Sequence, residues 1–306
     1  MRRLAGDSRI LDRAPRPDAS RASPASRAAE SPALPAPLAA LLARETLTAV
    51  GVVEITSLRR RDGPRRTFCI ELANGERVKG RTHREPAVAE RMSRWLPPLA
   101  AHGYAALRAA HGSATLEEWV VGAAIDAADA GSAQRAGELL GACHAALPIE
   151  VVPARDARLA AFREDARGWI EAIRDAGHVT PARASRIATE LEAHPPAAAR
   201  WGLYHGDFSP ENLVVDASGV RCVDNTTVRL QLLEIDAGFS INRWPLQGAV
   251  RERFLAGYGR RSDPALFLAS EGFWRLAAAL RSAAYRVRER TGDVLLPLRE
   301  IDAIVP

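Results

Sequence analysis

"HGDFSPENLVVDASGVRCVD", residues 205–224, is the most informative segment of the sequence. Asp207 and Asn212 are five positions apart in a polar loop, and Asp224 ends an apolar run twelve positions later. Between them "DASG" predicts a tight turn that joins two short strands. A loop and a strand end that are linked by such a hairpin can direct all three polar side chains toward one point.

These residue types are the ones that phosphoryl transfer requires. A carboxylate must orient the attacking hydroxyl and accept its proton, and we expect Asp207 in this role. An asparagine and a second aspartate must hold the Mg²⁺ ions that bridge the ATP phosphates, which predicts Asn212 and Asp224 as the metal ligands. The stretch therefore indicates ATP and Mg²⁺ as cofactors.

Lys79 is the one lysine among 42 basic residues, the others being arginines. A compositional bias toward arginine explains most of this, but lysine is a compact point charge and arginine a planar fork, so the two are not interchangeable at every site. Kinases place a phosphate-binding lysine on the third strand of their small lobe, and Lys79 lies in the third strand-like run. We predict that it binds nucleotide phosphates, an exposed strand lysine being the alternative.

The first third of the chain reads as a small sheet with one inserted helix. Strand-like runs occupy residues 52–58, 67–72 and 76–80, and further strands are expected near 104–110 and 115–122. Asn74-Gly75 is a strong hairpin signal between the second and third runs. Helices are expected near residues 36–47 and 84–96.

The rest of the chain is mostly helical. We expect helices near residues 132–147, with Ser132 as the N-cap, and near 155–176, 181–193 and 264–290. The segment 201–228 reads as a strand, a loop and a short hairpin. The fold class is therefore α+β, with a small mostly-β lobe before a larger mostly-α lobe.

The order of these segments resembles the aminoglycoside phosphotransferase and choline kinase family of protein-kinase-like small-molecule kinases. "HGDFSPEN" resembles the family's HGDxxxxN loop, and "VRCVDN" resembles its metal-binding strand end. "VKG…REPAVAERMSRWL" is similar to its lysine strand and helix, "LEEWVVG" to its hinge, and "LLEIDAG" to the segment that braces the loop. The resemblance covers roughly residues 40–260.

This resemblance implies a two-lobed protein-kinase-like fold and assigns further roles. Lys79 would pair with a glutamate of the helix, either Glu85, which we favour, or Glu90. Backbone groups near Glu118 and Val120 would bind adenine, and Asp236 would brace the loop. We expect a disordered tail over residues 1–36, an N-lobe over 37–115, a hinge over 116–122, and over 123–306 a C-lobe that holds the catalytic loop and the acceptor site.

Two departures from the family pattern keep an alternative open. Asn225 replaces the usual aromatic residue after the metal-binding aspartate, and Gly63 stands alone where a glycine-rich loop is usual. We predict a kinase that moves the γ-phosphate of ATP to a hydroxyl group of a small molecule. The alternative is a catalytically weak pseudokinase that binds nucleotide as a scaffold.

Charge and cysteine usage exclude several other classes. The net charge is +5, but residues 1–36 hold seven arginines against four acidic residues, so the basic excess lies largely in this tail and argues against a nucleic-acid partner. Three isolated cysteines fit a reducing cytoplasm, and no apolar run reaches membrane-spanning length. We therefore expect a cytoplasmic enzyme without a membrane partner, while ATP against GTP and the oligomeric state stay open.

The acceptor is expected not to be a strongly cationic aminoglycoside. In this family the helical lobe builds the acceptor site, and residues 241–306 hold eleven arginines against seven acidic residues. Because like charges facing each other cost affinity, we predict a neutral, zwitterionic or anionic hydroxyl compound.

Overall fold

The computed structural model describes residues 33–55, 66–244, 248–290 and 292–305, which belong to one compact unit spanning 32–306. The tail expected over 1–36 lies almost entirely outside the described residues, and so does Gly63. Across the described ranges, every helix is too short or too polar to traverse a lipid bilayer.

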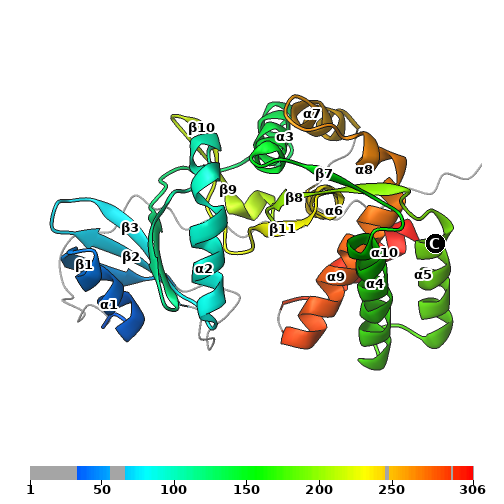
Figure 1. Cartoon of the computed structure of the whole chain (residues 1–306), viewed down its shortest axis with the longest axis horizontal. Coiled ribbons are helices and arrows are strands. Elements are labelled where there is room, and N and C mark those ends of the chain that lie inside the picture. Colours follow the sequence, from blue (N-terminus) through cyan, green and yellow to red (C-terminus); the bar gives the residue numbers. More distant parts are fainter. Residues whose placement is uncertain (1–32, 56–65, 245–247, 291, 306) are drawn as a thin grey trace, which may run out of the picture. The chain divides into compact units, whose positions relative to one another are not determined.

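The first part of the described chain is an antiparallel sheet with strand order β1-β2-β3-β5-β4. Its strands are β1 Ala49–Glu54, β2 Thr67–Leu72, β3 Arg77–Thr82, β4 Leu107–His111 and β5 Ala114–Glu118. The predicted hairpin between β2 and β3 is confirmed: the Asn74 side chain accepts a hydrogen bond from the Glu76 N–H at 3.0 Å, and Gly75 has φ of 80°. Figure 1 shows β1, β2 and β3 of this sheet in blue and cyan.

Two helices accompany the sheet. Helix α1, Ala36–Arg44, buries Leu38, Leu41 and Leu42 against the apolar side chains of β2, β3 and β5. Helix α2, Pro86–Trp95, begins two residues later than the expected range suggests, because Pro86 fits the first helical turn and Glu85 takes the extended conformation of an N-cap. A short 3₁₀ turn, η1 Pro97–His102, follows it.

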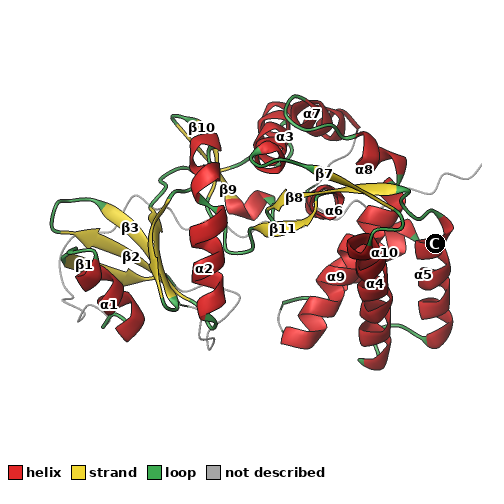
Figure 2. Ribbon diagram, viewed as in Figure 1, coloured by secondary structure: helices red, strands yellow, loops and turns green. Residues whose placement is uncertain are grey.

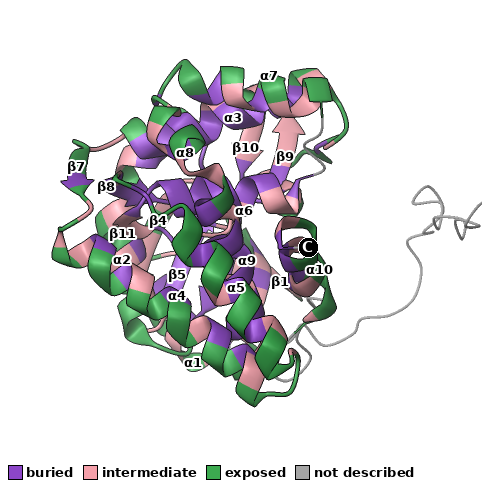
Figure 3. Ribbon diagram, turned by 90° about the vertical axis from the view of Figure 1, so that its right-hand side faces the viewer, coloured by how far each residue is buried: buried purple, intermediate pink, exposed green. Residues whose placement is uncertain are grey.

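The second part is mostly helical, as Figure 2 shows by the change from yellow to red. Its helices are α3 Ala130–Ala145, α4 Ala157–Asp175, α5 Pro181–Ala193, α6 Glu234–Arg243, α7 Gly248–Gly259, α8 Ala265–Ala269, α9 Glu271–Glu289 and α10 Leu295–Ile304. Helices α3, α6 and α9 carry the most buried residues of this part (Figure 3). The predicted α+β class, with a mostly-β part before a mostly-α part, is therefore confirmed.

Two small antiparallel sheets lie among these helices. One has the order β10-β9-β6 and the other β11-β8-β7. Their strands are β6 Ala123–Ala124, β7 Glu150–Pro153, β8 Ala198–Tyr204, β9 Leu213–Asp216, β10 Gly219–Cys222 and β11 Arg229–Leu232, with a 3₁₀ turn, η2 Pro210–Asn212, before β9. The predicted strand, loop and hairpin within 201–228 are confirmed.

Two local predictions were wrong. Asp129 rather than Ser132 caps α3, and its carboxylate accepts a hydrogen bond from the Ser132 N–H at 2.7 Å. The long helix expected over 264–290 is divided into α8 and α9, because Ser270 leaves the helical conformation with φ of −141° and ψ of 37°. In both places the spacing of apolar residues fits a helix. This spacing does not indicate which polar residue caps the helix or interrupts it.

Helices α3 and α7 approach each other closely at two glycines. A Cβ atom on Gly137 would lie 2.0 Å from the Phe254 carbonyl oxygen, and one on Gly257 would lie 2.0 Å from the Gln134 carbonyl oxygen. These contacts are to backbone atoms, so no side chain can move aside to relieve them. The packing of α3 against α7 thus requires both glycines.

We expect Gly257→Ala to lower the free energy of unfolding by about 3 kcal/mol, because the two helices must separate to admit the methyl group. The matched control is Gly168→Ala on the exposed side of α4, where a Cβ atom would meet nothing within 4 Å. It should raise stability by about 0.5–1 kcal/mol, since alanine is the better helix former. Urea unfolding measures the stability of both variants. Equal effects of the two substitutions would contradict the close packing of α3 against α7.

Candidate active site

The loop between β8 and β9 brings Asp207 and Asn212 into direct contact. The Asn212 side-chain amide donates to the Asp207 carbonyl oxygen at 2.8 Å and to its carboxylate at 3.0 Å. The η2 turn, which ends at Asn212, makes this approach possible. Because both donated bonds use the amide nitrogen, the amide oxygen of Asn212 stays available for another partner.

Asp236, at the start of α6, fixes the position of this loop through hydrogen bonds. Its carboxylate accepts the His205 N–H at 2.7 Å, the Gly206 N–H at 3.0 Å and the His144 side chain at 3.2 Å. Although burial by itself favours the neutral acid, the hydrogen bonds from His144 and the loop hold the pKa of Asp236 below its ordinary value. The brace expected of Asp236 is present.

His205 is fully buried beneath the loop, and its contacts are structural. Its Nε2 lies 3.2 Å from the Asn225 amide oxygen and 3.2 Å from Cys222 Sγ. Asn225 is also completely buried, and its amide nitrogen donates to the Ala105 carbonyl oxygen at 3.4 Å. Asn225 thus fills the place of the usual aromatic residue as a hydrogen-bonded part of the core.

Asp224 lies close enough to Asp207 for the two carboxylates to affect each other. Burial and then the negative charge of Asp224 raise the pKa of Asp207 above its ordinary value. A raised pKa suits a group that must accept a proton. Asp207, Asn212 and Asp224, which the sequence predicts as one constellation, therefore come together in the structure.

Lys79 reaches the same place from β3. Its ammonium group donates a hydrogen bond to the Val223 carbonyl oxygen, next to Asp224, and lies 3.4 Å from the Glu117 carboxylate. Glu117 faces Lys79 across the antiparallel β3–β5 pair. Burial lowers the pKa of Lys79 in spite of this carboxylate. Lys79 therefore lies beside the strand end that carries Asp224.

The expected partner of Lys79 is different from the one in the structure. Glu85 is the exposed N-cap residue of α2 and Glu90 lies on the exposed side of that helix, whereas the ion pair of Lys79 is with Glu117 of β5. The favoured Lys79–Glu85 pair is therefore corrected. Pro86 explains this geometry, because it starts α2 only after Glu85 and leaves that carboxylate outside the helix.

Arg81 and Glu117 are site residues that the sequence reasoning missed. Arg81 is two positions after Lys79 on the same side of β3, and it donates to the Asp224 carboxylate at 2.8 Å. Its Nε lies 3.7 Å from Glu117, which is fully buried with both carboxylate oxygens lacking hydrogen bonds. The period of two in a strand was the signal that could have found Arg81.

The segment expected to bind adenine follows β5. The Glu118 N–H donates to the Ala106 carbonyl oxygen at 2.8 Å, and its side chain forms a 2.6 Å ion pair with Arg221. Both the side chain and the backbone N–H of Glu118 are therefore occupied by contacts within the protein, so its N–H is not free to bind a nucleotide. Val120 is half-buried, and within the described chain its backbone N–H makes no hydrogen bond to protein.

The residues present fit Mg²⁺ that is shared with a nucleotide. In the described ranges there is no cluster of three or more His, Cys, Asp or Glu side chains able to hold a metal ion by itself. Two carboxylates and the free amide oxygen of Asn212 are the hard oxygen donors that Mg²⁺ prefers, and Mg²⁺ commonly completes its shell with water and substrate phosphates. Asn212 and Asp224 would hold it here.

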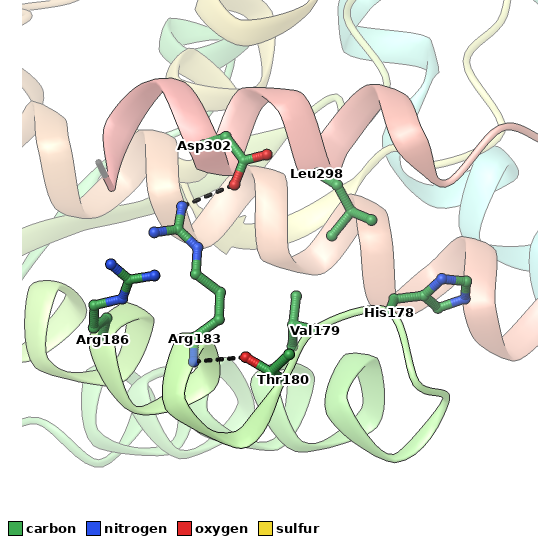
Figure 4. A pocket seen from close by; sticks show the side chains of 7 residues that line it. All are labelled: His178, Val179, Thr180, Arg183, Arg186, Leu298 and Asp302. Atoms are coloured by element: carbon green, nitrogen blue, oxygen red, sulfur yellow. Dashed lines mark hydrogen bonds and ion pairs between the residues drawn. The ribbon is translucent and has the colours of Figure 1, made fainter.

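A cavity of about 380 Å³ lies elsewhere, between the start of α5 and α10 (Figure 4). Thr180, Arg183 and Asp302 are among its lining residues, and Arg183 donates to the Asp302 carboxylate at 2.8 Å. None of the residues that meet around Asp207 lines this cavity. Asp302 is the one carboxylate among its lining residues and forms an ion pair with Arg183, so we do not assign the site there.

Glu117→Gln should destabilise the protein by about 3–5 kcal/mol, because it leaves Lys79 and Arg81 without their shared buried counter-charge. The matched control is Glu118→Gln, whose side chain is 31% exposed and pairs with Arg221. It should cost about 1 kcal/mol or less. Urea unfolding of both variants checks this, and a control as damaging as Glu117→Gln would show that Glu117 is not the central charge.

Several solved structures share this fold. A macrolide 2'-phosphotransferase from Brachybacterium faecium is 21% identical, with 89% of this chain and 99% of that chain covered and a TM-score of 0.57. A choline kinase from Cryptosporidium parvum is 11% identical, with coverage of 83% and 87% and a TM-score of 0.59. A putative fructosamine-3-kinase from Haemophilus somnus is 14% identical, with coverage of 88% and 96% and a TM-score of 0.59.

Among curated proteins, no sequence relative matches this chain. The sequence model of the phosphotransferase enzyme family matches residues 53–268, which is more than half of the chain. This range includes β3, the loop with Asp207 and Asn212, the strand end at Asp224, and Asp236. The chain therefore belongs to the phosphotransferase enzyme family.

Proposed function

We propose that this protein is an ATP- and Mg²⁺-dependent kinase that phosphorylates a hydroxyl group of a small molecule. The observation that carries the proposal is the meeting of two elements far apart in sequence: Lys79 donates to the Val223 carbonyl oxygen, beside Asp224, while Asn212 holds the Asp207 carboxylate. A nucleotide phosphate, a divalent cation and an acceptor hydroxyl each find a matching group there.

In the proposed reaction Asp207 accepts the proton of the acceptor hydroxyl. The acceptor oxygen forms a bond to the γ-phosphorus, the bond from that phosphorus to the bridging oxygen breaks, and its electron pair leaves with ADP. Mg²⁺, when bound, neutralises charge on the phosphates. Asn212 keeps the Asp207 carboxylate in one orientation through its 3.0 Å hydrogen bond, so little reorganisation is required before proton transfer.

On the nucleotide side we assign the phosphate contact to Lys79 and its support to Glu117 in place of Glu85. The Val120 N–H is the proposed adenine contact. Membership of the phosphotransferase enzyme family supports these roles at the level of the reaction type. The relatives named macrolide, choline and fructosamine kinases support a small-molecule acceptor, and a cytoplasmic location stays a prediction.

The proposal is tested by ADP formation with a panel of hydroxylated small molecules and with no acceptor. A kinase releases ADP and gives a phosphorylated product, seen by mass spectrometry, with at least one acceptor class. The pseudokinase alternative predicts Mg-ATP binding with no acceptor-dependent ADP. A chain that binds no nucleotide at all would overturn both.

We expect Asp207→Asn to lower turnover by about 10²–10⁴-fold while Mg-ATP binding is kept, because this nearly isosteric change removes only the proton acceptor. Asp224→Ala should instead weaken Mg-ATP binding, because it removes a metal ligand. Titration calorimetry with Mg-AMP-PNP and steady-state kinetics separate the two effects. Normal turnover in both variants would show that the catalytic assignment is wrong.

Lys79→Arg should lower kcat/KM by about 10²-fold or more without unfolding the protein. The longer planar guanidinium cannot keep the phosphates in line with the acceptor hydroxyl, and Arg81 already fills the adjacent space beside Glu117. The control is Arg77→Lys, the reverse exchange at an exposed position of β3, which should be silent. If both exchanges were silent, the single lysine would be an accident of composition.

A further inference from the structure

Three arginines from three separate elements gather beside Tyr204, the last residue of β8 before the catalytic loop. The guanidinium of Arg229, on β11, lies 5.6 Å from the centre of the Tyr204 ring, and that of Arg281, on α9, lies 5.4 Å from it. Arg91, on α2, donates to the Thr226 carbonyl oxygen at 2.9 Å, and α2 contacts β11. We call Arg91, Arg229 and Arg281 the arginine cluster.

The arginine cluster is half-buried and lacks the carboxylate partners that the buried arginines Arg81 and Arg200 have. Arg200 forms a 2.7 Å ion pair with Glu234, and Arg81 forms one of 2.8 Å with Asp224. By contrast, within the described ranges no carboxylate forms an ion pair with a member of the cluster. The carboxylates that act on the cluster do so from beyond ion-pair distance: Asp207 and Asp236 raise the pKa of Arg281, and Glu85 acts on Arg91. The three positive charges are therefore only partly compensated.

The neutral contacts of the cluster do not offset this charge. Arg281 donates to the Tyr204 hydroxyl, and the Nε of Arg91 is buried without a hydrogen-bond partner. Burial, followed by the positive charges of Arg281 and Arg91, lowers the pKa of Arg229. Three guanidinium groups that lie close together despite their mutual repulsion are suited to binding an anion. Arginine is the side chain best suited to this, because its planar guanidinium donates paired hydrogen bonds to an oxyanion.

The cluster lies close to the reacting group. Tyr204 is three residues before Asp207, and the negative charge of Asp207 is among those that raise the pKa of Arg281. The Arg91 contact is to Thr226, two residues after Asp224, whose carboxylate accepts from the Thr226 hydroxyl at 3.1 Å. An acceptor that presents its hydroxyl to Asp207 can therefore place a second group on the cluster.

We infer that the arginine cluster binds an oxyanion of the acceptor, so that the substrate is an anionic hydroxyl compound such as a hydroxy acid or a phosphorylated alcohol. The identity of the anion as part of the acceptor rests on the proposed kinase function. The binding of an anion at the arginine cluster does not depend on that function. The anion would be recognised by paired N–H donors of Arg229 and Arg281, with Arg91 closing the site from α2.

The first test is direct binding of inorganic sulfate, measured by titration calorimetry on the full chain with and without Mg-AMP-PNP. Nucleotide fills the site at Lys79, so sulfate binding that persists beside it reports a second anion site. We expect saturable binding that weakens about tenfold or more in Arg229→Gln and is unchanged in Arg155→Gln, an exposed control before α4. Absence of saturable binding, or equal binding in Arg229→Gln, would overturn the inference.

This experiment distinguishes a failure of the proposed kinase function from a failure of the proposed anion site. Loss of Mg-AMP-PNP binding in the wild-type chain speaks against the kinase function, whereas sulfate binding that ignores Arg229 speaks against the anion site. If Arg229→Gln lowers the melting temperature, Arg91→Gln and Arg229→Lys replace it. We expect Arg91→Gln to weaken sulfate binding and Arg229→Lys to retain part of it, and wild-type affinity in Arg91→Gln would count against the cluster.

The second test compares acceptors that differ in charge alone, such as glycerate and glyceramide. The acid should have the higher kcat/KM by about tenfold or more, and Arg229→Gln should remove this preference mainly through KM, because the anion contact positions the acceptor and takes no part in the chemistry. Equal use of the acid and the amide by the wild-type chain, or an unchanged preference in Arg229→Gln, contradicts the inference.

Discussion

The buried carboxylate of Asp236 is the constraint on which the site depends. A charge that is removed from water is tolerated only when hydrogen-bond donors replace the water, and Asp236 obtains three of them from His205, Gly206 and His144. Two of these donors are backbone groups of the catalytic loop, so the loop cannot shift without exposing a buried charge. Through this requirement α6 determines where Asp207 stands.

The same requirement extends into the helical part. His144 donates to the Asp236 carboxylate from Nε2, and its Nδ1 lies 2.7 Å from the Tyr258 hydroxyl. Tyr258 in turn accepts from Arg200 at 2.9 Å. This chain joins α3, α6, α7 and β8. The close α3–α7 packing therefore supports the loop as well as the core, because a displacement of α7 would move Tyr258 and with it His144.

The sequence predicted well where a motif lies within one hairpin or turn, although it missed the N-cap of α3 and the break between α8 and α9. The spacing of Asp207, Asn212 and Asp224 lies within one hairpin, and the turn at Asn74-Gly75 fixes the register that places Lys79 on β3. It failed where partners come from separate elements. Glu117 faces Lys79 only because β5 pairs with β3, a non-consecutive pairing that no local spacing encodes. Glu85 was favoured because Arg84-Glu85 resembles the start of the family's helix, but Pro86 begins α2 after Glu85 and leaves that carboxylate outside the helix.

The charges of the site are divided between its two sides. Around the metal position the carboxylates of Asp207, Asp224 and Glu117 outnumber the cations of Lys79 and Arg81, which suits Mg²⁺. On the acceptor side the arginine cluster has no carboxylate of its own among the described residues. A polycationic acceptor would meet repulsion there and an anionic one attraction, so the local contacts argue more firmly than net charge against an aminoglycoside. In the proposed function, arginines that lack an ion pair would select the acceptor by its charge.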